Sequence, residues 1–309
     1  AGTLTIDNGA TFDLAGAFTQ TSTGAVGTVN LGANITTADA AVSIADAVTL
    51  TNDVTIDSST TNSGQSAATT GGTVTLGAAI NSDGTARALT IGAGTGDVVF
   101  EAAANVGTAA AAGSALASID VSAANITLRN VTTTGTQLYT ASNLIDTNST
   151  YISDGANITF AGATQMNSSL VVDTGAGAGT VAFTSTLDSE SGEANTLDIT
   201  AGTGNIDFDG VVGGTTPLGA VTIKSATDVT ADMAFSAASL RQEDGSGTTT
   251  FTGALTTTAA EGIEVDGTNF NFNDAVSLTL GDLDVDSSGT VRFNGLVTTS
   301  DNTNGLVTI

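Results

Sequence analysis

A three-part unit that recurs along the whole chain is the feature that most constrains the fold. The unit opens with an aliphatic, a small or polar, and a second aliphatic residue, here called the first triplet. It occurs at residues 4–6, 42–44, 54–56, 89–91, 119–121, 170–172, 197–199, 221–223, 263–265 and 283–285. Because alternation with a period of two places every second side chain on one face, each triplet predicts a short strand with one buried face.

Two further parts complete the unit. A second triplet, which mostly ends in Phe or Leu, occurs at residues 98–100, 126–128, 158–160, 181–183, 206–208, 270–272 and 291–293. A corner aliphatic follows three or four residues later, at Val131, Leu187, Val211, Leu255, Val276 and Leu296. The period is visible in the phenylalanines, which recur about every 21–25 residues, with one double step where Val229 marks the missing coil, at Phe160, Phe183, Phe208, Phe251, Phe272 and Phe293.

This period decides the fold class. A strand, a crossover helix and a second strand need about 30 residues, so the repeat excludes doubly wound and barrel α/β folds. Aromatic residues make up only 4% of the chain, which indicates a narrow core. We therefore predict an all-β chain that forms a right-handed parallel β-helix, or β-solenoid, of about 14 coils of roughly 20–25 residues. It should form a single continuous domain over 1–309, with irregular coils or longer loops around 102–165.

A single coil of this kind cannot be stable alone. About five buried aliphatic side chains, at ~2 kcal/mol each, do not offset the ordering of about 22 residues, so neighbouring coils must supply the difference. Triplet-like residues occur at both ends of the chain, at 4–6 and 306–309. The sequence therefore predicts that the stack continues, either into further coils of the same polypeptide or by end-to-end self-association.

Composition argues against several functional classes. The net charge is −26, and the five basic residues are scattered, which argues against binding of nucleic acid. The chain has neither His nor Cys, so imidazole bases and thiolate nucleophiles are absent, and we expect no catalytic residues and no required cofactor. The longest uncharged stretch, 102–119, is too rich in small and polar residues to predict a membrane span.

One carboxylate pattern suggests calcium. Asp282, Asp284 and Asp286 alternate with apolar residues, so the three carboxylates should share an exposed face. One coil earlier, Glu264 and Asp266 should occupy the equivalent positions. Either solvent and salt screen these like charges, or calcium bridges them.

The motif Gly-x-Gly-x-[Val/Ile]-x-Phe followed by corner aliphatics, in a chain poor in Lys and free of Cys, resembles the repeat regions of large bacterial exoproteins. These are the filamentous-haemagglutinin-type adhesins and the β-strand-repeat surface proteins. The resemblance implies a secreted, extracellular or cell-surface protein without enzymatic activity, serving as a rigid spacer or filament subunit. Cell-surface or matrix polysaccharide is a further class of partner. The alternative is a tailspike-like or polysaccharide-processing β-helix, which would need a groove of carboxylates and aromatic residues.

Overall fold

The computed structural model describes residues 2–22, 27–59, 70–108, 113–299 and 306–309. Within these residues every regular element is a strand and no helix occurs. The strands are paired in parallel and form a β-solenoid of about 13 turns, which confirms the predicted fold class. Two compact units can be distinguished, Ala1–Asp146 with Tyr151–Ser153, and Thr147–Thr150 with Asp154–Ile309. The handedness of the coil stays a prediction.

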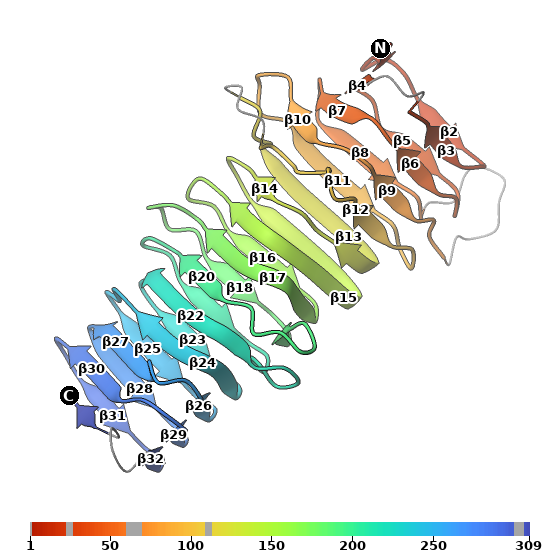
Figure 1. Ribbon diagram of the computed structural model, residues 1–309. Coiled ribbons are helices and arrows are strands. Elements are labelled where there is room, and N and C mark those ends of the chain that lie inside the picture. The colour runs from red at the N-terminus through yellow and green to blue at the C-terminus, as the bar shows by residue number, and fades with distance from the viewer. Residues whose placement is uncertain (1, 23–26, 60–69, 109–112, 300–305) are drawn as a thin grey trace. The chain divides into compact units, whose positions relative to one another are not determined.

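The first unit stacks its strands in three columns, each named after its part of the repeat (Figure 1). The corner column contains β1 (Thr3–Ile6), β4 (Thr28–Leu31), β7 (Ala47–Leu50) and β10 (Ile80–Ser82), and continues through bridges at Val106 to β14 (Val131–Thr132). The first-triplet column contains β2 (Phe12–Leu14), β5 (Ile35–Thr37), β8 (Val54–Asp57), β11 (Ala88–Gly92) and the leading halves of β13 (Ser118–Thr127) and β15 (Gln137–Ile152). The second-triplet column contains β3 (Phe18–Gln20), β6 (Val42–Ile44), β9 (Val74–Leu76), β12 (Val98–Phe100) and later parts of β13 and β15.

The second unit has the same three columns. Its first-triplet column contains the end of β17 (Thr164–Asp173), β20 (Leu197–Thr200), β22 (Leu218–Ser225), the end of β24 (Phe235–Gln242), β27 (Ile263–Gly267), β30 (Leu283–Ser287) and β33 (Val307–Thr308). Its second-triplet column contains β16 (Ile158–Ala161), β18 (Val181–Phe183), β21 (Ile206–Phe208), β23 (Val229–Ala231), β25 (Thr248–Phe251), β28 (Asn269–Phe272) and β31 (Val291–Phe293). Its corner column contains the start of β17, β19 (Leu187–Ser189), Val212, the start of β24, β26 (Leu255–Thr257), β29 (Val276–Leu278) and β32 (Val297–Thr299).

The inward and outward faces of the triplets follow the predicted alternation. In the second unit the strands of the first triplets align as one column, and inward residues such as Ile199 and Phe208 are fully buried. Two assignments in the first unit are wrong. Residues 4–6 lie in the corner column and residues 42–44 in the second-triplet column, because all three columns there carry the same aliphatic alternation.

The corner position also needs a correction. Val212 and Val297, not the predicted Val211 and Leu296, pair with the buried corner residues of neighbouring coils. Leu296 is 70% exposed. From Phe183 onward, the corner residue of each coil lies four positions after the last residue of the second triplet. The sequence prediction allowed a spacing of three or four residues. Where two aliphatic residues are adjacent, it therefore chose the first of them instead of the second.

The phenylalanines of the second triplets stack along the core of the second unit. Phe160 and Phe183 lie 4.9 Å apart between ring centroids, with planes 8° from parallel. Phe272 and Phe293 stack in the same way at 4.8 Å and 7°. Because the coils are in register, identical side chains fall above one another, and offset stacking is a favourable geometry for them.

The stretch around 102–165, predicted to hold irregular coils or longer loops, combines isolated bridges with long strands. Residues 103–117, where described, form only isolated bridges, but β13 and β17 have 10 residues each and β15 has 16. In β15 the inward positions include Gln137 and Tyr139, which are both fully buried. The Tyr139 hydroxyl donates to Gln137 Oε1 at 2.9 Å, and Gln137 Nε2 donates to the Ile152 carbonyl at 2.7 Å. A satisfied polar network thus replaces aliphatic side chains here, and a search for aliphatic triplets misses the strand.

Glycine is required at the turn before some second triplets. Gly94 and Gly202 have φ values of +56° each, and a β-carbon on Gly202 would lie 2.4 Å from the Gly175 carbonyl oxygen. Gly94 precedes strand β12, so the Gly-rich stretch at 92–96 is a turn between strands and lacks the helix that a dinucleotide-binding loop needs.

Candidate functional site

The five carboxylates proposed for calcium lie on two adjacent coils of the second unit. Strands β27 and β30 pair in register, so Glu264 lies beside Asp284 and Asp266 beside Asp286. Glu264, Asp282, Asp284 and Asp286 are exposed, and Asp266 is half-buried. The two coils are therefore equivalent in register, as predicted. Each pair places two carboxylates on neighbouring strands, whose backbones lie about 4.8 Å apart.

A basic residue flanks this carboxylate column. Arg241 occupies the same ladder position one coil before Glu264. Its Nε lies 3.7 Å from Glu264 Oε2, and one of its terminal nitrogens lies 3.2 Å from Glu243 Oε1. Both pairs are largely exposed, so each adds little stability, but together they place positive charge at one end of the column.

Asp282 has a structural partner. Its Oδ1 accepts a hydrogen bond from the backbone N–H of Leu306, one coil later, at 3.0 Å. The same contact recurs at six other Asn or Asp residues that directly precede the first inward residue of a strand. In each case the side-chain oxygen accepts a hydrogen bond from a backbone N–H of the next coil. The pairs, with the acceptor first, are Asn34 and Thr55, Asp53 and Ala88, Asn157 and Thr180, Asn205 and Asp228, Asp228 and Thr248, and Asn269 and Thr290.

We call this recurring contact the strand-entry bond. It satisfies a backbone donor at or near the start of the strand in the next coil. It also explains why sequences of the Asn-x-Thr type recur, at Asn34 and Asn157 for example: Asn at strand entry is followed by an inward aliphatic and an outward Thr. Asp282 is therefore a member of this structural series.

Among the described residues, no group of three or more Asp or Glu side chains is arranged to hold a metal ion. Calcium binding by the column from Glu264 to Asp286 stays a prediction.

A second carboxylate group lies around Asp207 on the outward side of β21. Partial burial raises the pKa of Asp207, and the nearby carboxylates of Asp209, Asp232 and Asp228 raise it further. Asp207 is therefore repelled by three neighbouring carboxylates when it is ionised.

A hollow of about 510 Å³ opens on the surface of the first unit. It lies at the connections that lead from the corner column to the first-triplet column. In the first coil this connection comprises residues 7–11, and it is longer than the connections of the next two coils, residues 32–34 and 51–53. The floor includes the small buried residues Gly32 and Ala33. The lining is completed by Asn8, Ala10, Thr11, Phe12, Asp13, Asn34, Thr36, Asn52 and Asp53.

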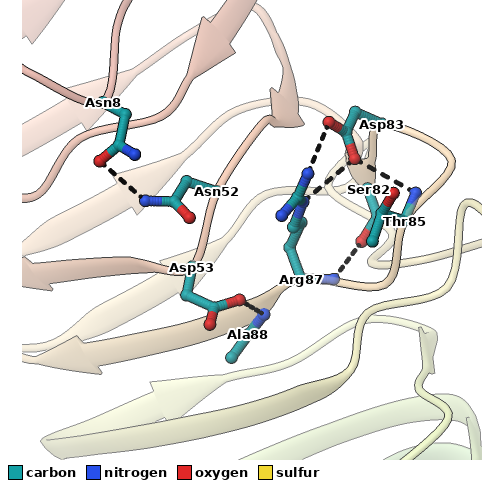
Figure 2. A network of polar contacts seen from close by, with 8 residues as sticks. All are labelled: Asn8, Asn52, Asp53, Ser82, Asp83, Thr85, Arg87 and Ala88. Carbon is teal, nitrogen blue, oxygen red and sulfur yellow. Dashed lines mark hydrogen bonds and ion pairs between the residues drawn. The ribbon is translucent and has the colours of Figure 1, made fainter.

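The side-chain amides of Asn8 and Asn52 contact each other at this hollow, across the coil that lies between them. Figure 2 shows Asn52 Nδ2 donating to Asn8 Oδ1, at 3.0 Å, although the two residues belong to coils that are two apart. A side chain at Gly32 would crowd this part of the hollow, because a β-carbon there would lie 3.2 Å from the Asn8 backbone nitrogen and 2.6 Å from Thr51 Oγ1. The absence of a side chain at Gly32 thus opens the hollow.

Strand-entry bonds hold two of the lining side chains. Asn34 Oδ1 accepts from Thr55 N–H at 2.8 Å, and Asp53 Oδ1 accepts from Ala88 N–H at 2.9 Å. The second polar atom of each side chain, Asn34 Nδ2 and Asp53 Oδ2, has no hydrogen-bond partner within the described part of the chain. These atoms are therefore held in place and can bind a ligand.

An ion pair lies close to this site. Arg87 and Asp83 form two contacts, at 3.1 and 3.0 Å, which Figure 2 shows beside Asp53. The hydrogen bond from Arg87 lowers the pKa of the Asp83 carboxyl. Asp53 also attracts the Arg87 guanidinium, and both carboxylates, Asp83 foremost, raise the pKa of Arg87.

Sequence reasoning missed this site. The residues carry no catalytic motif, and the signal that could have found them is the two extra residues between β1 and β2 beside a Gly in the next coil. The two tyrosines of the chain, Tyr139 and Tyr151, are fully buried with ring centroids 5.9 Å apart, so neither ring lies at the surface.

The three in-register columns define a parallel β-solenoid repeat protein in each unit. No family model matches the chain, and neither the curated proteins nor the solved structures contain a match. No helix of the described residues is long and apolar enough to span a membrane.

Proposed function

We propose that this chain is a non-enzymatic structural protein, a rigid β-solenoid spacer or filament subunit of a bacterial surface fibre or adhesin. The observation that supports the proposal is the regularity of the stacking within each unit. In the second unit, for example, one column of outward positions runs in register through six successive coils, at Val171, Asp198, Thr222, Arg241, Glu264 and Asp284. Each coil adds a fixed step, and length is the property that such a repeat controls.

The outward side chains fit this role. They are mainly Thr, Ser, Asn and Asp, and the excess of carboxylates suits an exterior where salt screens repulsion. We propose a further coil of the same kind as a partner, because the inward-facing Val307 and Ile309 are 43% and 71% exposed. This coil could come from the same polypeptide or from a second copy.

The spacer role can be tested by removing one coil. Deleting residues 240–262 brings Ile263 to the ladder position of Leu240. Spin labels can be attached at Val171→Cys and Asp284→Cys alone, because the chain has no other cysteine. The two positions lie five ladder steps apart, or about 24 Å. We expect the deletion variant to fold and the distance to shorten by about 4.8 Å. An unfolded deletion variant, or an unchanged distance, would contradict a modular spacer.

Two further measurements separate the spacer from its alternatives. Antibodies against the chain should bind intact cells of its source, and binding only after lysis would contradict a surface role. Incubation with polysaccharides should release no new chain ends, whereas release of reducing or unsaturated ends would favour a polysaccharide-processing β-helix.

A further inference from the structure

We propose that the hollow between Asn8 and Asp53 binds an uncharged hexose unit of a polysaccharide. This inference goes beyond the spacer role and does not depend on it. The volume of about 510 Å³ lies within the usual range for small-ligand sites of about 300–1,000 Å³.

The polar groups of the hollow match the hydroxyl groups of a sugar. Each hydroxyl both donates and accepts, so a sugar site needs donors and acceptors side by side. Asn34 Nδ2 and Asn8 Nδ2 are donors, and the carboxylates of Asp13 and Asp53 are acceptors. An anionic or purely apolar ligand would leave one of these sets unpaired.

Three of these four groups are held in place before binding. Asn34 and Asp53 are held by strand-entry bonds to the next coil, and Asn8 is held by Asn52. Preorganised side chains reduce the entropy that binding must offset. The hollow therefore differs from an ordinary exposed group of Asn and Asp side chains.

An apolar surface is also present. The ring of Phe12 is half-buried and lines the hollow, and it packs edge-to-face on Phe18 with centroids 5.6 Å apart. The C–H face of a hexose can lie on such a ring, which supplies contact area that a hydrated ion would not use.

Charge selects among sugars. The lining includes Asp13 and Asp53 and no Lys or Arg. An acidic sugar would place its carboxylate near two others in a chain of net charge −26. An uncharged hexose does not incur this repulsion.

The test is calorimetric titration of the whole chain with glucose, galactose and mannose, and with the uronate of each. We expect at least one uncharged hexose to bind at one site, and its uronate to bind at least about tenfold more weakly. The double variant Asn8→Ala with Asp13→Ala removes a donor and an acceptor from exposed positions, so affinity should fall by about tenfold or more while the melting temperature stays near that of the wild type.

Asn294→Ala is the matched control. It removes a similar amide contact between neighbouring coils, Asn294 Nδ2 to Asn273 Oδ1 at 2.9 Å, but from the second unit. Its affinity for the hexose should equal that of the wild type. The proposal is overturned if no hexose binds, if the double variant binds as tightly as the wild type, or if the uronates bind as well as the hexoses. None of these outcomes bears on the coil-deletion test of the spacer.

Discussion

Phe235 fills the space that Ala231 leaves in the core of the second unit. Ala231 pairs with Phe208 on one side and Phe251 on the other, so it occupies a position that is Phe in both neighbouring coils. Phe235 comes instead from the corner column, and its ring packs edge-to-face on both, with centroids 5.5 Å from Phe208 and 5.6 Å from Phe251. The coil keeps its core volume by exchanging a large and a small residue between two columns.

This exchange predicts how substitutions combine. Phe235→Ala should lower the free energy of unfolding by about 3–5 kcal/mol, because it leaves a cavity beside Ala231. Ala231→Phe alone should cost about 1–3 kcal/mol through overpacking. The pair Ala231→Phe with Phe235→Leu restores the arrangement of neighbouring coils and should be more stable than either Phe235→Ala or Ala231→Phe. Thermal unfolding of the wild type and the three variants measures this, and a pair no more stable than Ala231→Phe alone would contradict the volume exchange.

The carboxylate group around Asp207 predicts a dependence of stability on pH. The pKa of Asp207 is raised in the folded protein, so the folded state favours its protonated form, and this contribution is lost as pH rises through the folded pKa. Asp207→Asn should therefore raise the melting temperature at pH 7. The gain should disappear below about pH 3, where the wild-type carboxyl is protonated in both states.

Asp198→Asn is the control for this experiment. Asp198 lies 3.4 Å from Lys224 Nζ, so removing its charge loses an attraction instead of a repulsion. Its melting temperature at pH 7 should stay level or fall slightly. Equal gains for both variants would mean that net charge, and not the local group, sets the effect.

The strand-entry bond predicts a difference between two substitutions at one residue. Asn269→Ala removes the acceptor of the Thr290 N–H and should cost about 1 kcal/mol, whereas Asn269→Asp keeps an acceptor oxygen and should cost less. Amide hydrogen exchange at Thr290 provides a local readout, with faster exchange expected only in the Ala variant. Unchanged exchange would show that water replaces the bond without loss.

The sequence predicted the fold well because one period controls both strand and turn. The inward positions of the first and second triplets of the second unit were found from the alternation alone, since outward Thr or Asp and inward Val, Ile or Phe differ sharply in polarity. The coil of Gln137 and Tyr139 was not found, because its core is a hydrogen-bonded polar network that resembles a loop in composition.

The sites were harder to predict. The register of Glu264 with Asp284 could be read from the repeat, because it depends only on counting within two similar coils. The strand-entry role of Asp282 and the hollow beside Asn8 depend on contacts between successive coils and on the length of a connection. These are properties of the stack and are not visible in one coil.

The remaining prediction concerns calcium at the column formed by Glu264, Asp266, Asp284 and Asp286. If a divalent cation bridges these in-register pairs, calcium should raise the melting temperature and a chelator should lower it, because the ion removes the repulsion along the ladder. Glu264→Gln with Asp284→Asn should abolish the response to calcium.

Arg241→Gln provides a second arm, because it removes the only basic side chain that contacts the column among the described residues. If calcium binds, this variant should respond more strongly to calcium than the wild type, since the cation then meets no competing charge. Asp282→Asn keeps an acceptor for the Leu306 N–H and should leave the response largely unchanged if Asp282 acts in strand entry alone. Identical melting of all variants with calcium and with chelator would mean that salt screening alone accommodates the carboxylates.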